Sequence, residues 1–442
     1  MKFKPLLTAC FVGTLMSATA QAENLLEIYK LALDNDPIFR SAGAQLEANL
    51  ESQNQSFSAL LPNLSGSYSH GYSKSGSATG VGTASQSESR SDSYALSLSQ
   101  SIYDYSTWVG YDQAKKQAEQ ARVQFKSSKQ ELIVRVARVY LDVLSAQDNL
   151  DFALAEQKSI KQQLEQTKQR YEVGLIAITG VHEAQARFDQ SEANRIAAQN
   201  RLDNASEALR EITGRYHESL GRLKKDIPLA SPEPARIDDW VQVAKESNLS
   251  IVSANMALYI AKQDVKRRYA GHMPSVGLSA SYSDTDADPS SFPINTESYG
   301  LSAGITVSVP LYSGGRTQSS VRQGEALSKK AEYDLESALR GTVRNTRSSY
   351  LGVEASISSI KALQQSVISQ ESALEATQAG FEVGTRTIVD VLLSTTSLYS
   401  ARSSLASARY NYVLAVLQLK QAAGILTVDD LEMINNWVDT SS

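Results

Sequence analysis

The sequence predicts a mainly α-helical fold with inserted β-strands, built from two copies of one unit. The first observation is a short phrase that twice ends a long helix-like stretch, as Tyr171–Gly174 and, 210 residues later, as Phe381–Gly384. The second is that each copy contains two segments in which polarity alternates from one residue to the next. A repeat this long is a duplicated domain-sized unit, because solenoid modules span only about 20–50 residues.

The N-terminal residues 1–22 are typical of a secretory signal peptide. Lys2 and Lys4 precede a mostly apolar stretch, and Ala20–Ala22 fits a small-x-small cleavage site. Cys10 is the single cysteine, so we expect the mature chain to form no disulfide and to use no thiol chemistry. The residues before Cys10 also fit a lipoprotein box, but the apolar stretch that continues beyond Cys10 disfavours this alternative.

Composition excludes several classes of function. The chain carries 43 Lys and Arg against 48 Asp and Glu without a dense basic stripe, so we expect no nucleic-acid partner. We expect no metal site, no cofactor and no catalytic residue, because the four histidines are scattered without ligand spacing. These are His70, His182, His217 and His272. The chain is therefore not expected to be an enzyme.

Four segments alternate with a period of two, which places their side chains on two opposite faces of a sheet. We expect strands at about residues 62–73, 92–103, 274–284 and 298–310. One face is rich in Leu, Tyr, Val and Ile, whereas the other is almost entirely Ser, Thr and Gly, which suits a wet lumen. About 10 residues suffice for a tilted strand to cross an outer membrane. These segments therefore predict membrane strands rather than two hairpins on a soluble core.

The two expected hairpin connections, 74–91 and 284–297, are polar. In the second, Asp284, Asp286 and Asp288 have the spacing of a calcium loop, but the glycine and the bidentate glutamate of such a loop are missing. We therefore expect solvated loops.

Closure of the sheet requires more than one chain. Four strands cannot close a barrel, and open sheet edges are not viable in lipid. Three chains would pool twelve strands, an even number above the observed minimum of about eight. The strands thus predict a symmetric oligomer.

Between the strands, proline-free stretches predict long helices at about residues 105–172, 180–222, 314–382 and 387–424. Alanines one heptad apart, such as Ala146 and Ala153, indicate close, coiled-coil-like packing. A periplasmic coiled-coil adaptor or a structural filament is the alternative interpretation. It does not account for strands inserted at the same place in each copy.

The expected organisation has four parts after the signal peptide. They are a first repeat at 23–226, a proline-rich linker at 227–240, a second repeat at 241–426 and a tail at 427–442. Gly174 and Gly384 are expected to end helices, because glycine suits the left-handed residue beyond a C-cap.

Seven phrases resemble the TolC family, and in their order they cover essentially the whole mature chain. They are Glu23–Leu25, Leu60–Pro62, Gln100–Ile102, Gly174–Thr179, Leu202–Ala205, Gly384–Leu392 and Ala408–Tyr412. The resemblance implies a homotrimeric channel-tunnel, with a 12-stranded outer-membrane β-barrel, four strands per chain, continuous with a long α-helical barrel in the periplasm.

The resemblance also implies a function. Such a protein is the passive exit duct of tripartite efflux pumps and type I secretion systems. Its partners would be a periplasmic adaptor (membrane fusion protein) and an inner-membrane RND, ABC or MFS transporter. The linker would lie at the equator of the helical barrel, and the turns at Gly174 and Gly384 would form the tips that contact the adaptor.

Carried over residue by residue, the resemblance implies a pore constriction at Asp390. The second constriction position is Leu393, so that ring would be apolar. Three Asp390 carboxylates around a narrow axis would attract cations and raise one another's pKa. Without the resemblance, Asp390 is better explained as a first-turn acid favoured by the dipole of a helix N-terminus; with it, the pore ring is favoured.

A latch at the tip is also implied, although its usual partners differ here. Arg386 matches the family's latch arginine, whereas Phe381 stands where relatives have tyrosine and Gly180 where they have aspartate. Thr179 remains beside Gly180, and Glu183 is a nearby acid that can replace the missing partner.

Overall fold

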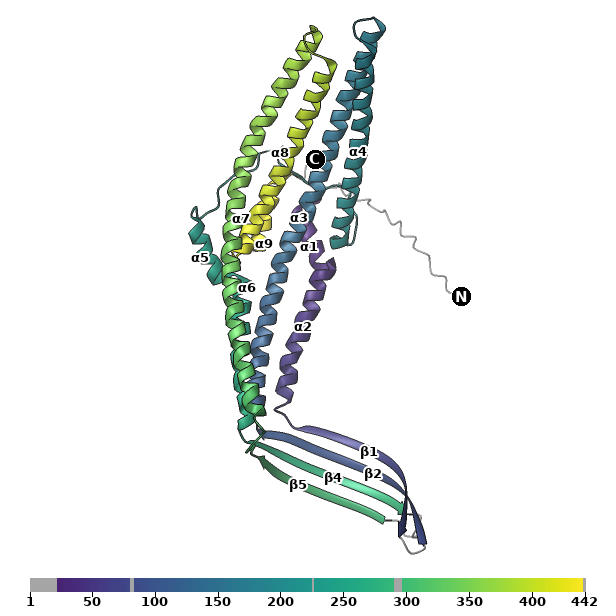
Figure 1. Ribbon diagram of the computed structural model, residues 1–442, viewed down its shortest axis with the longest axis vertical. Coiled ribbons are helices and arrows are strands. Elements are labelled where there is room, and N and C mark those ends of the chain that lie inside the picture. The colour runs from purple at the N-terminus through teal and green to yellow at the C-terminus, as the bar shows by residue number, and fades with distance from the viewer. Residues whose placement is uncertain (1–21, 80–82, 225, 290–295, 440–442) are drawn as a thin grey trace, which may run out of the picture.

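The computed structural model describes residues 22–79, 83–224, 226–289 and 296–439. The predicted signal peptide, 1–22, lies outside the described residues except for Ala22. The molecule is elongated, with a β-sheet at one end and the turns of two long helical hairpins at the other (Figure 1). Mainly helical structure with an inserted sheet is the fold class that the sequence predicts.

The same order of elements occurs twice, which makes the duplication visible in the structure. The first copy contains α1 (Leu25–Asn35), α2 (Pro37–Ser58), β1 (Asn63–Thr79), β2 (Thr83–Tyr103), α3 (Tyr105–Glu172), α4 (Ile178–Thr213) and the short β3 (Arg222–Leu223). The second contains α5 (Ile237–Ser247), α6 (Leu249–Tyr269), a 3-10 turn (Ala270–His272), β4 (Ser275–Pro289), β5 (Thr296–Ser308), α7 (Arg316–Glu382), α8 (Ile388–Ala422), α9 (Val428–Asn435) and β6 (Val438–Asp439).

Polar side chains fix where the helices begin. Asp36 caps α2 by accepting a hydrogen bond from the Phe39 amide (2.8 Å), and Pro37 occupies the first helical turn. The Asp36 carboxylate is buried and pairs with Arg135 of α3 at 2.7 Å, so the cap also ties α2 to the long helix. Asp104 caps α3 in the same way through the Ser106 amide (2.8 Å).

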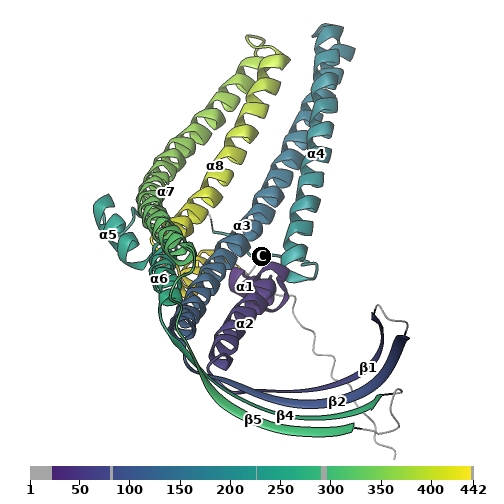
Figure 2. The same ribbon diagram turned by 60° about the horizontal axis from the view of Figure 1, so that its bottom comes forward.

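The sheet has the order β1-β2-β4-β5 and all neighbours are antiparallel. Strands from the two copies meet at β2 and β4, where Leu96 lies opposite Tyr282. The sheet is strongly curved (Figure 2). Its edges, β1 and β5, have no further strand beside them within the described chain.

The strands are longer than predicted, and this corrects the expected hairpin loops. Most of 74–91 is strand, with Lys74 on β1 paired to Glu88 on β2 at 2.5 Å. Asp284, Asp286 and Asp288 lie on one face of β4 and do not form a loop. Polar composition hid these ends, because backbone pairing continues after the apolar alternation stops. Within the described residues, no group of three or more His, Cys, Asp or Glu is placed to hold a metal ion.

Two helix boundaries also differ from the prediction. The helix expected to reach residue 222 ends at Thr213, because Gly214 adopts a left-handed conformation (φ 79°) that stops it. The expected linker ends earlier, since α5 begins at Ile237, and the tail contains α9. None of the described helices is long and apolar enough to cross a membrane.

The main core lies at the waist of the molecule, where α1, α3, α8 and α9 meet. Tyr140 is fully buried and donates a hydrogen bond to the Gly221 carbonyl (2.7 Å), which fixes the segment after α4 against α3. Tyr412 contacts the proline-rich linker through the Ala230 amide (3.1 Å) and stacks on Trp437. A second, smaller core lies near the hairpin turns.

Gly424→Ala is expected to lower the melting temperature of the helical circular dichroism signal by several degrees. Gly424 ends α8 with φ 78°, and a left-handed alanine costs about 1–2 kcal/mol. Its Cβ would also stand 2.6 Å from the Asn248 Cα. The matched control is Gly352→Ala inside α7, where a Cβ meets no atom within 4 Å and melting should not fall. Equal melting of both variants would contradict this close packing.

Candidate functional site

Both helical hairpins turn through the same hydrogen-bonded motif. In the first, the Gly174 amide donates to the Tyr171 carbonyl (2.9 Å) and the Leu175 amide to the Arg170 carbonyl (2.9 Å). The second repeats this pattern with the amides of Gly384 and Thr385. This is a Schellman motif, which requires a left-handed residue, and both glycines have φ near +80° (74° and 81°). Both turns lie at the end of the molecule remote from the sheet (Figure 1).

The turns expose branched apolar side chains. Val173 and Leu175 are 70% and 71% exposed, and Val383 on the second turn is 75% exposed. No Cβ placed on Gly174 or Gly384 would meet another atom within 4 Å, so both glycines are open to contact. Apolar groups exposed together at a rigid tip are typical of a protein-binding surface.

Asp390 belongs to a capping box at the start of α8. Its carboxylate accepts hydrogen bonds from the Thr387 amide and hydroxyl (both 2.9 Å), while its own amide donates to the Thr387 hydroxyl (3.3 Å). The Thr387 amide, then the Thr387 hydroxyl and the nearby charge of Arg386, lower the pKa of Asp390 in the single chain. Leu393, one turn further along α8, is 46% exposed.

Arg386 is exposed, and its stem lies against Gly380 on the same hairpin, since a Cβ at Gly380 would come within 2.7 Å of the Arg386 Cγ. Thr179 and Glu183 are exposed on α4. Within the described chain, neither residue forms a side-chain hydrogen bond or ion pair with Arg386. A latch through these groups would therefore have to act between different protomers.

Gly180 lies where the two hairpins touch. A Cβ built on it would stand 3.4 Å from the Ile388 Cγ2, which is ordinary packing distance. Ile388 belongs to the small core near the turns. Its other buried members are Ile160, Leu164, Ala184, Phe381, Val391 and Leu392. Apolar packing, rather than an ionic network, therefore joins the hairpins at Gly180.

Besides the packing at Gly180, the two hairpins are joined near their turns by Arg170 and Phe381, a contact that the sequence did not predict. Arg170, on the last turn of α3, donates a hydrogen bond to the Phe381 carbonyl (3.3 Å), and its guanidinium lies 4.5 Å from the centre of the Phe381 ring. Phe381 is only 8% exposed. No pattern in the sequence marks Arg170, because its partner lies 211 residues away.

Toward the waist, the same two hairpins are joined by buried polar groups. The Thr396 hydroxyl donates to Glu156 (2.8 Å), and the Tyr410 hydroxyl donates to Asp148 (2.6 Å). Burial raises the pKa of both carboxyl groups and of Tyr410. These groups fix the register of α3 against α8.

The sheet has an apolar band bounded by tyrosines. Tyr68 and Tyr94 lie opposite each other, with ring centres 5.0 Å apart, and Tyr103 closes the band at the helical end. From Tyr94 to Tyr103 the strand covers about 30 Å, which is about 23 Å along the membrane normal at a tilt of about 40°. That height matches the apolar belt of an outer-membrane protein, about 25 Å.

The two faces of the sheet differ as predicted. Tyr299 and Leu301 on the apolar face are 80% and 79% exposed. On the opposite face, the hydroxyls of Ser281 and Ser302 lie 2.8 Å apart. One face can therefore contact lipid while the other lines a wet space.

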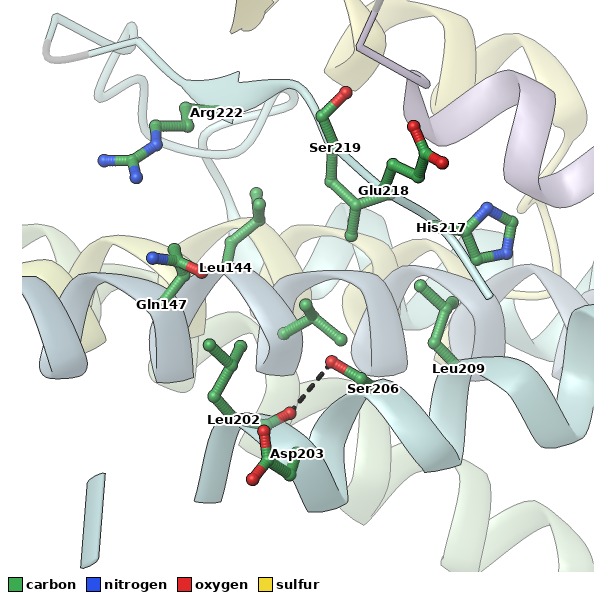
Figure 3. A pocket seen from close by; sticks show the side chains of 12 residues that line it. Leu144, Gln147, Leu202, Asp203, Ser206, Leu209, His217, Glu218, Ser219 and Arg222 are labelled. Atoms are coloured by element: carbon green, nitrogen blue, oxygen red, sulfur yellow. Dashed lines mark hydrogen bonds between the residues drawn. The ribbon is translucent and has the colours of Figure 1, made fainter. Parts of the chain in front are cut away.

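A cavity of about 590 Å³ lies away from both regions, between α3, α4 and the segment that follows α4 (Figure 3). Two of its lining groups form ion-pair contacts: Arg222 contacts Asp151 (2.9 Å), and the buried His217 contacts Glu23. These pairs brace the waist.

Comparison with known proteins identifies strong similarities. The profile of a family described as outer membrane efflux protein matches residues 28–215 and 240–425, once in each copy. The chain is 42% identical to the outer membrane protein TolC of Vibrio cholerae over 98% of both chains. It is 33% identical to the alkaline protease secretion protein AprF of Pseudomonas aeruginosa, over 95% of this chain and 88% of that one. The crystal structure of the outer membrane protein VceC of Vibrio cholerae superposes with a TM-score of 0.74 at 20% identity, covering 90% of this chain and 96% of that one.

Gly384→Ala is expected to increase hydrogen exchange at the second turn, because alanine is strained at φ 81°. Exchange measured by mass spectrometry on a peptide covering 380–392 should rise in this variant. Gly384→Asn should change it less, since asparagine tolerates the left-handed region. Gly380→Ala is not a suitable control for this experiment, because its Cβ would collide with the Arg386 side chain. Protection unchanged in the alanine variant would contradict the Schellman turn.

Proposed function

We propose, from the premise that this chain belongs to the outer membrane efflux protein family, that it is an outer-membrane exit duct for efflux and for type I protein secretion. One observation carries the proposal. A sheet with an apolar outer face runs almost directly into helices, since β2 ends at Tyr103 and α3 begins at Tyr105. With 68 residues, α3 extends about 100 Å, which gives a continuous path from the membrane far into the periplasm.

The protein resides in the outer membrane and extends into the periplasm. We infer that three copies assemble, so that four strands from each close a 12-stranded barrel and the helical hairpins form a barrel below it. The edges β1 and β5, beside which the described chain places no further strand, support this inference, because β1 of one copy can supply the backbone groups that β5 of the next needs.

Transport through such a duct is passive, so an energised partner is required. A periplasmic adaptor and an inner-membrane transporter would supply the substrate and the energy. The exposed tips at Gly174 and Gly384 are the proposed adaptor contact, supported by the exposed Val173, Leu175 and Val383. The family consists of channels, and we propose no enzymatic activity.

The gate is proposed at the same end. Around a threefold axis, Asp390 would form a charged constriction and Leu393 an apolar one, which resists wetting. Thr387 lowers the pKa of Asp390, whereas the other carboxylates of an Asp390 ring would raise it, because neighbouring carboxylates raise one another's pKa. Arg386, Thr179 and Glu183 remain latch candidates between protomers. Phe381 and Gly180 contribute apolar contacts within one protomer.

A periplasmic coiled-coil adaptor or structural protein is not favoured. A protein of that kind does not require a four-stranded sheet with one face of exposed apolar residues, such as Leu301 and Tyr299, and an opposite face lined by serine. The sheet instead requires a lipid environment on one side.

Complementation tests the proposed duct. Deleting the gene should sensitise the cell to detergents, bile salts and drugs, and the wild-type gene should restore resistance. Leu301→Arg should not restore it, because arginine on the lipid face costs about 2–4 kcal/mol near the membrane midplane. The matched control is Ser302→Arg on the opposite face, which should still be found in the outer membrane. A deletion without phenotype, or equal membrane insertion of both variants, would contradict the proposal.

Asp390→Asn is expected to reduce the cation selectivity of the reconstituted pore, read as a smaller reversal potential in a salt gradient. In the wild type, selectivity should hold above the pKa of Asp390 and decline as the pH falls through it, because only the ionised carboxylate attracts cations. Thr387→Val removes the hydroxyl that lowers this pKa, so it should move the decline to higher pH. An unchanged reversal potential in Asp390→Asn would refute the proposed ring of Asp390 carboxylates at the constriction.

A further inference from the structure

We propose that Arg170 and Phe381 form the contact that holds the two helical hairpins of one protomer together at the gate, an aromatic latch that replaces an ionic one. The inference rests on the proposed duct and names a residue of its gate that the sequence reasoning does not supply. Four features of the described residues support it.

The first is position. Arg170 is on the last turn of α3, in the first copy, and Phe381 is on the last turn of α7, in the second. The pair therefore links the two hairpins within four residues of each turn glycine, where any separation of the tips must be largest. Contacts nearer the waist would change far less for the same movement.

The second is the double contact. The Arg170 guanidinium lies 4.5 Å from the centre of the Phe381 ring and also donates to the Phe381 carbonyl at 3.3 Å. A cation over an aromatic face is attracted by the ring quadrupole, and the attraction grows when the ring is withdrawn from water. Phe381 is 8% exposed and anchored in the small core beside Ile388 and Leu392, so the ring is held in place for its partner.

The third is that no acid forms an ion pair with Arg170 within the described residues. A cavity of about 600 Å³ opens beside the pair and is lined largely by neutral side chains, among them Gln163, Gln166 and Gln378. Glu382 also lines it, but no ion pair joins Glu382 to Arg170 in the part of the chain that the structure describes. Arg170 is thus free to act on Phe381.

The fourth is the spacing of α3 contacts. Asn149, Glu156 and Arg170 lie at multiples of seven residues, and each contacts the other hairpin. Asn149 accepts from Ser403 and Glu156 accepts from Thr396, both on α8. Heptad spacing keeps these residues on one side of α3, facing the second hairpin. Arg170 is the last of this series and its only cation.

The consequence is a gate that opens by separating a cation from a ring. Opening must move the α7–α8 tip away from α3, which breaks both contacts of Arg170 at once. The open-to-closed ratio therefore depends on the identity of both side chains, and their effects should not be independent.

Single-channel recording of the purified trimer in planar bilayers tests the latch. Arg170→Met keeps the apolar stem but removes the charge and the donor, and Phe381→Leu keeps the burial but removes the ring. Each should raise the ratio of high-conductance to low-conductance dwell time about tenfold, equivalent to about 1.4 kcal/mol. The double variant should gain no more than either single variant, because both changes break the same contact.

Conservative variants separate a latch from a merely structural role. Arg170→Lys keeps the cation and Phe381→Tyr keeps the aromatic face, so both should stay within about threefold of the wild type. Arg201→Met is the matched control, because Arg201 is exposed on α4 and donates to the Ala197 carbonyl of its own helix (3.2 Å). It should behave as the wild type. Hydrogen exchange at 376–386 should rise in Arg170→Met and not in Arg201→Met.

The latch is overturned if Arg170→Met gates like Arg201→Met, if the effects of Arg170→Met and Phe381→Leu multiply to about a hundredfold, or if Arg170→Lys opens as readily as Arg170→Met. In each case a conducting wild-type pore leaves the proposed duct standing. A wild-type protein that conducts no ions would overturn the duct and the latch together.

Discussion

The backbone groups at the two edges of the sheet, which have no partner strand within the described chain, are the constraint on which the rest of the structure depends. In hydrocarbon there is no water to satisfy an N–H or C=O group, so a membrane sheet must close on itself. The sheet of this chain ends at β1 and β5, and its apolar face is most exposed on β5, where Tyr299 and Leu301 are 80% and 79% exposed. We therefore propose that other copies complete the sheet. In that assembly α3 and α7, which follow β2 and β5 closely, would be placed around the same axis as the strands.

The duplication supplies two hairpins with the same turn and different chemistry after it. The first copy restarts its helix at Ala177 without a side-chain cap, whereas the second uses the Thr387–Asp390 capping box. After its turn the second copy carries Arg386 and Asp390, where the first copy has Ile176 and Gly180. The first copy contributes Arg170, whose partner is an aromatic ring on the second. In the proposed gate, the inequivalent copies would give each protomer two unlike halves.

The sequence predicted the features that depend on periodicity. Alternation located the apolar parts of all four strands, and the glycines at 174 and 384 located both turns. The prediction was wrong where the alternation ends. The Ser- and Asp-rich strand ends were predicted as loops, although backbone pairing extends β1 to Thr79 and β4 to Pro289. The candidate site was predictable only on α8, where Asp390 follows a capping threonine. Arg170 was not predictable, because its significance arises from a tertiary contact between the two copies.

Native mass spectrometry of the purified protein in detergent tests the central claim, closure of the sheet between protomers, most directly. The account predicts a single dominant species containing three chains, which resists dissociation until the detergent is removed or the sheet is unfolded. It also predicts that the protein does not stay in solution without detergent, because the face that carries Leu301 is apolar. A monomer that remains dissolved in water would contradict the account.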